Sequence, residues 1–483
     1  MSRMRADADP HPTVTTTTGA LRGTRQGGVD RYLGIPYALP PFGERRFALP
    51  QAVPEWSDVR DATEHGPTAP QDPYFGALGA LLGSVDIPGD DILTANVWAP
   101  ADAAGTGAAL PVFVWYHGGA LERGTPALPA YDGTTFARDG VVFVSIGYRV
   151  GAEGFSVLEA APRNLGLSDA AAGLRWVRSE IARFGGDPER ITIAGESAGG
   201  ALVAALLSRP DTATIPVAAI IQSGPLEAVT PERAGRVTRA LAKELGLAAT
   251  REAFAGVSPR ALLDARRRLA EGSNPLSGTP GYALAVDPET MPVSPDVALR
   301  AVDIPLVIGT NTDEYRLWLT PEQLAGISAL KLTLARLATG VPRRAVRAYR
   351  AAFPGASAGE ILGQIVTDRL LRGPAARVAA ARTAPTYFYE LAWPSPVRDL
   401  RAAHAIDIGF VFDRLEASDS QTVVGPDAPR ELAARMHADW VGVVRTGEPG
   451  WPRHGAGREV QLYDVPPRVT ALRRADALDS LPD

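Results

Sequence analysis

The stretch Ile191-Thr-Ile-Ala-Gly195-Glu-Ser197-Ala-Gly199-Gly-Ala201-Leu-Val-Ala-Ala-Leu-Leu207 decides the fold. Its first four residues are typical of a buried strand, and the run from Ala201 onwards is typical of a buried helix. Between them, Gly195–Gly199 matches Gly-x-Ser-x-Gly, in which two glycines permit a tight strand-to-helix turn. The pattern therefore predicts Ser197 as a nucleophile that stands exposed at this turn.

The pentapeptide by itself is a weak signal. A chain of 483 residues with 49 glycines is expected to contain about 0.2 chance matches. The alternative is a glycine-rich turn whose serine only caps the following helix, because serine is a favoured N-cap residue. The order of strand, turn and helix around Ser197 favours the nucleophile.

Outward from this turn, apolar strand-like segments alternate with helical ones. The pattern from Leu165 to Phe184 predicts a helix, and the alternation predicts an α/β protein with a largely parallel sheet, as in the α/β-hydrolase fold. The expected strands are Thr13–Thr18, Ile92–Trp98, Pro111–Tyr116, Val141–Ile146, Ile191–Ala194, Val217–Gln222, Ile304–Ile308 and Thr386–Leu391.

Two longer stretches, about 231–297 and 321–382, are rich in Ala, Arg and Leu. We interpret both as helical insertions that form a lid over the site. No repeat or low-complexity linker marks a second domain, so we expect one domain over 12–483 and a flexible N-terminus over 1–11.

Composition excludes several classes of function. The chain has 45% hydrophobic residues, a net charge of −5 and no cysteine. The absence of a long basic run argues against nucleic acid as a partner, and we expect neither a metal nor a cofactor. With no apolar signal segment and no spanning stretch, we expect no membrane partner and a cytoplasmic location. A small molecule is the expected partner.

An oxyanion hole is expected after the strand Pro111–Tyr116. The sequence continues with His117-Gly-Gly-Ala120, similar to the His-Gly-Gly-Gly loop of lipases and esterases. Small residues let backbone N–H groups approach the negative oxygen of a tetrahedral intermediate. The predicted donors are Gly119, Ala120 and Ala198, and His117 is interpreted as a loop-shaping residue.

The general base should follow the nucleophile and the acid in the chain. Of the downstream histidines, His437 lies in an expected helix and His454 lies in a polar tail. His404, in a loop that enters an apolar segment, is therefore best placed. The acid should follow a late strand, and the sequence after Ile304–Ile308 supplies two carboxylates, Asp313 and Glu314. Either could orient an imidazole.

The chain resembles the type B carboxylesterase and cholinesterase family, in particular its short bacterial para-nitrobenzyl-esterase-like members. The resemblance runs almost from end to end and implies the fold and a serine esterase activity. The blocks that carry it include Gly34-Ile-Pro-Tyr-Ala38, Tyr131-Asp-Gly133, Asn164-Leu-Gly-Leu-Ser-Asp169, Phe184-Gly-Gly-Asp-Pro188, Gly195-Glu-Ser-Ala-Gly199, Asp313-Glu314, His404-Ala-Ile-Asp-Ile-Gly-Phe-Val-Phe412 and Arg445-Thr-Gly447.

The resemblance assigns roles residue by residue. It implies a triad of Ser197, Glu314 and His404, with Asp313 as the runner-up acid, and an oxyanion hole of Gly119, Ala120 and Ala198. It also implies two buried ion pairs, Arg46 with Asp90 and Arg149 with Asp169. Tyr315 departs from the family pattern, in which glycine usually follows the acid.

Other residues near the triad in sequence are candidates for supporting roles. Ser223 could support the Glu314–His404 pair with its hydroxyl, or could cap a helix. Leu121, Leu317, Trp318 and Phe410 are candidates for the pocket wall, with ordinary core as the alternative.

These residues and the resemblance predict hydrolysis of carboxylic esters through an acyl-enzyme. The alternatives are an amidase, a thioesterase or an acyltransferase with the same chemistry, or a catalytically silent binding module.

Overall fold

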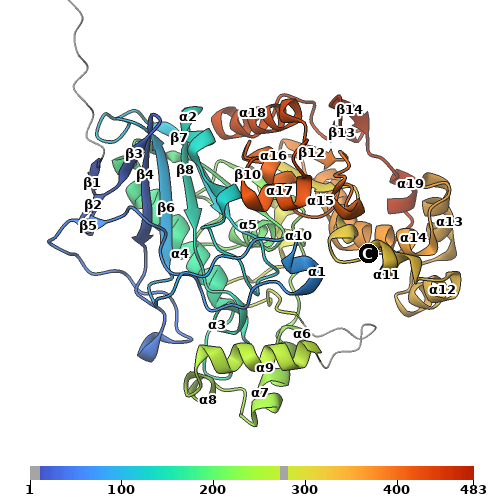
Figure 1. Cartoon of the computed structure of the whole chain (residues 1–483), viewed down its shortest axis with the longest axis horizontal. Coiled ribbons are helices and arrows are strands. Elements are labelled where there is room, and N and C mark those ends of the chain that lie inside the picture. The colour runs from blue at the N-terminus through green and yellow to red at the C-terminus, as the bar shows by residue number, and fades with distance from the viewer. Residues whose placement is uncertain (1–10, 272–280, 483) are drawn as a thin grey trace, which may run out of the picture.

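The computed structural model describes residues 11–271 and 281–482 (Figure 1). Apart from His11, the N-terminal segment expected to be flexible lies outside these residues.

One large sheet organises the described chain. Its 11 strands run in the order β14-β13-β12-β11-β10-β9-β7-β8-β6-β4-β3. The central neighbours, from β13 across to β8, pair in parallel, and the strands at both edges pair antiparallel. The strands are β3 (Thr24–Gln26), β4 (Val29–Pro36), β6 (Thr94–Pro100), β7 (Leu110–Tyr116), β8 (Val142–Ile146), β9 (Gly186–Glu196), β10 (Ala218–Gln222), β11 (Leu306–Asn311), β12 (Thr386–Leu391), β13 (Glu459–Tyr463) and β14 (Arg468–Ala471). A separate small sheet joins β1 (Thr13–Thr15), β2 (Ala20–Arg22) and β5 (Arg60–Asp61).

Every strand predicted from sequence overlaps an observed strand, and the predicted helix is α4 (Leu165–Glu180) followed by a 3-10 turn over Ile181–Phe184. The main strand that the pattern did not predict is β4. Two features hide it: the charged pair Asp30-Arg31, and Gly34, whose φ of 69° interrupts the strand. Asp30 is nevertheless buried, because Arg25 pairs with it at 2.5 Å.

Alternating side chains of each central strand face two separate cores. Along β7, Val112 and Val114 belong to one core, and Phe113 and Trp115 belong to the other. The first core is covered by α4 and α5 (Ala198–Leu206), and the second by α2 (Thr134–Arg138) and α18 (Arg430–Thr446). Both faces of the sheet are therefore buried, as a parallel sheet requires.

The two predicted insertions are helical, and in Figure 1 most of their helices form two groups, one at the bottom of the view and one at its right. The first holds α6 (Pro231–Ala234), α7 (Arg236–Leu245), α8 (Arg251–Ala255), α9 (Pro259–Glu271) and α10 (Pro295–Ala298), and residues 272–280 within it lie outside the described part. The second holds α11 (Pro321–Ala325), α12 (Ala329–Ala338), α13 (Arg343–Ala352), α14 (Ala358–Thr367), a π-helical turn (Asp368–Arg372) and α15 (Gly373–Ala381).

The remaining helices are short: α1 (Gly76–Gly79), α3 (Gly151–Phe155), α16 (Asp407–Val411), α17 (Ser418–Val424) and α19 (Ala475–Leu478). Over 11–271 and 281–482, no helix combines the length and the apolar character needed to cross a bilayer.

Candidate active site

Ser197 stands at a strained turn between β9 and α5. Its backbone has φ 56° and ψ −123°, and its side chain makes no capping hydrogen bond to the helix. The two glycines allow this turn: a Cβ on Gly195 would lie 2.4 Å from the Gly199 carbonyl carbon, and one on Gly199 would lie 2.0 Å from the Tyr116 oxygen. The geometry is that of a nucleophile elbow rather than of a serine cap.

His404 and Glu314 form a short, buried pair beside this turn. His404 Nδ1 lies 2.5 Å from Glu314 Oε2. The other carboxylate oxygen, Oε1, accepts from Ser223 Oγ at 2.6 Å and from the Asn311 N–H at 2.7 Å. Glu314 is fully buried. This arrangement fixes both the tautomer and the orientation of the imidazole.

Asp313, the runner-up acid, lies away from the imidazole. Its N–H donates to the Ala402 carbonyl at 2.8 Å, and its carboxylate lies 4.0 Å from Arg316 Nε. Burial raises the pKa of Asp313 to about 6, although Arg316 and Arg401 oppose the shift. Of the two adjacent carboxylates, the structure brings only Glu314 to His404.

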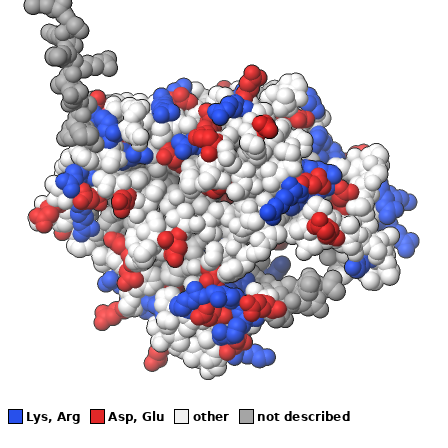
Figure 2. Space-filling model, viewed as in Figure 1, with Lys and Arg blue, Asp and Glu red and all other residues white. Residues whose placement is uncertain are grey.

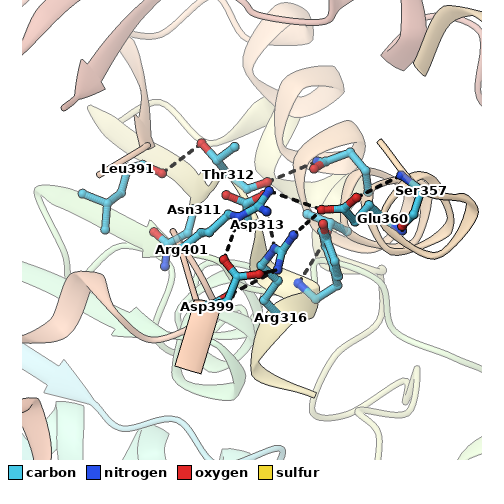
Figure 3. Close-up of polar contacts among 12 residues, drawn as sticks. Asn311, Thr312, Asp313, Arg316, Ser357, Glu360, Leu391, Asp399 and Arg401 are labelled. Carbon is cyan, nitrogen blue, oxygen red and sulfur yellow. Dashed lines mark hydrogen bonds and ion pairs between the residues drawn. The ribbon is translucent and has the colours of Figure 1, made fainter. Parts of the chain in front are cut away.

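Arg316 ties the loop of Glu314 to the two segments beside it (Figure 3). Its guanidinium, almost completely buried, lies 2.6 Å from Glu360 Oε1 on α14 and 2.6 Å from Asp399 Oδ2 in the segment that leads to His404. Glu360 also completes a capping box with Ser357 at the start of α14. The acid loop, the histidine loop and one helix of the second insertion are thus joined through one arginine.

Three backbone N–H groups beside Ser197 are open. Gly119 and Ala120 have φ of 116° and 58°, and a Cβ on Gly119 would lie 2.1 Å from the Arg123 oxygen. The N–H groups of Gly119, Ala120 and Ala198 donate to no described residue. Both Gly119 and Ala120 line the same cavity as Ser197.

His117 does not reach the triad. It stacks on Tyr148 with ring centroids 4.3 Å apart, and burial lowers its pKa to about 4. The tyrosine hydroxyl donates to the His117 carbonyl at 2.7 Å, so this histidine braces the loop.

A second carboxylate, that of Glu196, faces the imidazole from the turn that holds Ser197. Glu196 Oε1 lies 3.1 Å from His404 Nε2, the nitrogen opposite the one that Glu314 holds. Burial raises the pKa of Glu196 to about 8, although His404 opposes the shift. Burial alone would lower the pKa of His404, but Glu196 and Glu314 outweigh it and raise that pKa to about 9. Each of the two groups therefore holds its proton to a higher pH than the same group does in water.

The sequence analysis missed Glu196 and also Asp407, which accepts from Gln222 at 2.8 Å and from Tyr389 at 3.0 Å behind the histidine. The sequence contained a signal for each of these two carboxylates. Glu196 is the only charged residue in the apolar run that ends β9, and Asp407 is the charge in the apolar segment after His404. A charge in a buried run needs a partner, and here each of the two carboxylates lies near His404.

Comparison with known proteins agrees with this geometry. The model of the carboxylesterase family matches residues 10–458. The chain belongs to this family. It is 35% identical to para-nitrobenzyl esterase of Bacillus subtilis, over 94% of this chain and 95% of that protein. It is 33% identical to phenmedipham hydrolase of Pseudarthrobacter oxydans, over 91% and 90% of the two chains.

Among solved structures, the fold superposes on the carboxylesterase of Geobacillus stearothermophilus with a TM-score of 0.86. The two are 34% identical, and the match covers 97% of this chain and 100% of that one. The chain is thus a carboxylesterase of the α/β-hydrolase fold, and the predictions of family, fold and enzyme class are confirmed.

Two cavities of this carboxylesterase meet at Ser197 and His404, and Ala120 and Trp318 line both. The first cavity has a volume of about 130 Å³ and includes Leu317, Glu196 and Asp419 in its wall. The second has a volume of about 350 Å³. Its wall is mostly apolar and includes Leu121, Leu284, Val366, Leu370, Leu371 and Tyr282. Residues of both insertions therefore contribute to the second cavity.

Two expectations about individual residues of the carboxylesterase are corrected. Phe410 lines neither cavity: it is fully buried in the core and packs on Trp393, with ring centroids 5.3 Å apart. It lies on α16, whose turn directs it away from Ser197. Arg46 pairs with Glu153 at 2.5 Å instead of with Asp90, because Asp90 is exposed while Glu153 is buried on α3.

The expected pair of Arg149 with Asp169 is present at 2.7 Å and fully buried. Within the described ranges of the carboxylesterase, no cluster of three or more acidic or histidine side chains is arranged to hold a metal ion.

Proposed function

We propose that this carboxylesterase cleaves esters with Ser197 as nucleophile, His404 as general base and Glu314 as the orienting acid. The supporting observation is the 2.5 Å contact between His404 Nδ1 and Glu314 Oε2, next to a serine at a strained elbow. No other described histidine both pairs with a buried carboxylate and lines a cavity with a serine.

The reaction proceeds in two halves. His404 Nε2 takes the proton of Ser197, whose oxygen attacks the ester carbonyl and forms a tetrahedral intermediate. The N–H groups of Gly119, Ala120 and Ala198 bind the negative oxygen of that intermediate. His404 then protonates the leaving alcohol, and an acyl-enzyme remains. Water, activated by the same imidazole, releases the acid and restores Ser197.

His404 Nε2 can take this proton when the imidazole is neutral, which the raised pKa of about 9 favours toward alkaline pH. It makes no hydrogen bond to a described residue, although Glu196 lies near it. Catalytic hydrogen bonds often shorten only when substrate binds. Ser223 and Asn311 keep the Glu314 carboxylate in place during the proton transfers, because both donate to Oε1.

The second cavity suits the larger apolar part of the ester. Its volume of about 350 Å³ and mostly apolar wall fit a medium acyl chain better than the first cavity, whose volume is about 130 Å³. The insertions at 231–297 and 321–382 act in this proposal as the lid of one catalytic domain, because residues of both form this wall. A cytoplasmic location is part of the same proposal, since the chain has no cysteine for disulfides.

A chromogenic ester series from acetate to decanoate, run on wild type and Ser197→Ala, tests the proposal. We expect the substitution to lower turnover by about 10⁵-fold or more and to abolish labelling by a fluorophosphonate, with an unchanged circular dichroism spectrum. Turnover that persists in Ser197→Ala would refute the nucleophile. Labelling of wild type without ester turnover would instead favour transfer to another acyl acceptor.

A further inference from the structure

Most leucines of the helix α12 face solvent instead of the protein core. Leu332, which is 2% exposed, faces inward, whereas Leu330, Leu334 and Leu337 are 68%, 57% and 61% exposed. The spacing of these three places them on one face of the helix, opposite Leu332. A stripe of leucines therefore points into solvent.

The same segment carries only positive charge. We call residues 329–352, with α12 and α13, the α12–α13 hairpin. It contains six basic residues and no Asp or Glu, although the whole chain has a net charge of −5. The six are Lys331, Arg336, Arg343, Arg344, Arg347 and Arg350. Figure 2 shows Lys and Arg side chains at the right-hand edge, where Figure 1 places α13.

The second observation is that these charges lack acidic partners among the residues that the structure describes. None of the six forms an ion pair with a residue in the described part of the chain. The helix α9 offers a contrast, since it is also rich in arginine: Arg266 pairs with Glu122 at 2.9 Å, Arg267 with Asp72 at 3.0 Å and Arg268 with Glu244 at 2.6 Å. The α12–α13 hairpin is left with both its charge and its leucines unpaired.

We propose that the α12–α13 hairpin docks the enzyme on an anionic lipid surface. Exposed leucines on a helix with basic neighbours and no acidic ones are the combination that lies in the boundary between headgroups and acyl chains. Nucleic acid would use the arginines but leave the leucines in water. A second copy meeting through the same face would bring like charges together.

The hairpin lies one helix away from the second cavity. Leu332, Val341 and Tyr349 pack with Ile361 and Ile365 of α14 in a separate small core. The next residues along this helix and the π-helical turn, Val366 and Leu370, line the second cavity and are themselves exposed. A lipid layer against the hairpin is therefore near the apolar wall of the site, which suits esters with apolar chains dissolved in that layer. This statement on substrate rests on the proposed function, whereas the binding does not.

Vesicle flotation tests the binding directly. Wild-type enzyme is mixed with vesicles of phosphatidylcholine alone, or of equal parts phosphatidylcholine and phosphatidylglycerol. We expect flotation only with the anionic vesicles, and less of it as salt is raised. Replacing Arg343, Arg344, Arg347 and Arg350 together by Gln should weaken partition about tenfold or more. Leu330→Ser, Leu334→Ser and Leu337→Ser combined should weaken it similarly.

A matched control replaces four exposed arginines elsewhere, Arg183, Arg233, Arg236 and Arg300, by Gln. It changes the net charge equally and should float like wild type. All variants should hydrolyse a water-soluble ester at the wild-type rate, which shows that they are folded. A wild-type enzyme that binds the anionic vesicles but hydrolyses no ester would count against the proposed function and not against the lipid binding.

Three results would overturn the proposal. They are equal flotation of the control and the hairpin variants, binding of wild type to DNA but not to anionic vesicles, and a dimer that the leucine substitutions dissociate.

Discussion

The helices α5 and α12 are a matched pair with opposite environments. Both are short and rich in Ala and Leu, and both follow a serine: Ser197 for α5 and Ser328 for α12. Every residue of α5 is buried, between the sheet and α4, whereas Leu332 is the only buried residue of α12. The comparison shows that composition alone does not determine burial. Changes around α5 should therefore be costly, and changes on α12 should be tolerated.

The largest effect is expected beside α5, at the acid. Glu314→Gln keeps the shape of the side chain but removes the charge that stabilises the imidazolium, so kcat should fall by about 10³–10⁴-fold. Asp313→Asn is the matched control, because it changes the adjacent carboxylate and should lower kcat less than about tenfold. Steady-state kinetics on one ester measure both. Equal losses in the two variants would show that the acid is wrongly assigned.

The second prediction concerns stability and compares the helices directly. Leu202→Ala on α5 should lower the free energy of unfolding by about 3 kcal/mol, because it leaves a cavity in a fully buried site. Leu334→Ala on α12 should change it by less than about 0.5 kcal/mol. Urea denaturation measures both. A large loss of unfolding free energy for Leu334→Ala would mean that the exposed leucines of α12 are covered in solution.

A third test addresses the junction between the two regions. Arg316→Met leaves the carboxylates of Glu360 and Asp399 without their shared partner. Both carboxylates remain partly exposed, so we expect the free energy of unfolding to fall by about 2 kcal/mol. A fully buried, unpaired charge would lower it more. Because the loops of Glu314 and His404 are joined through Arg316, kcat should fall with little change in KM. Arg316→Lys should restore part of kcat, which a loss of packing alone does not explain.

The smallest effect is a shift in a pH profile. His404 acts as base only when deprotonated, so a pKa raised to about 9 means that kcat/KM falls as pH decreases through this range. Glu196→Gln removes one of the negative charges that raise the pKa, so the fall should move about one unit toward acidic pH. Asp419→Asn, in the same cavity wall, should not move it. An unchanged profile for Glu196→Gln would contradict the coupling of Glu196 to His404.

The parts of the site that sequence reasoning located depend on local geometry. The turn at Ser197 needs a glycine two residues before and two residues after the serine, and the loop at Gly119 needs small neighbours. Both requirements are visible as short patterns in the sequence. The resemblance to the family supplied the choice of Glu314 over Asp313. The sequence pattern could not make that choice, since adjacent residues differ only in the direction of their side chains.

The misses at Glu196 and Arg46 depend on contacts between residues distant in the chain. Glu196 approaches His404 only because the sheet aligns β9 with the loop after β12. Arg46 reaches Glu153 rather than Asp90 for a similar reason, since burial decides which carboxylate is available. Phe410 follows His404 by six positions in the sequence, but it lies on α16 and is buried in the core.

The contact between Tyr315 and α14 has a consequence for chimeric enzymes. A Cβ on Gly363 would lie 2.2 Å from the Tyr315 ring, and the Gln364 amide donates to the Thr312 carbonyl at 3.2 Å. An exchange of residues 321–382 between relatives would therefore replace the surface on which the acid loop rests. A recombination point placed before Thr312 would transplant the loop with its own support, whereas one placed after Tyr315 would separate parts that are fitted to each other.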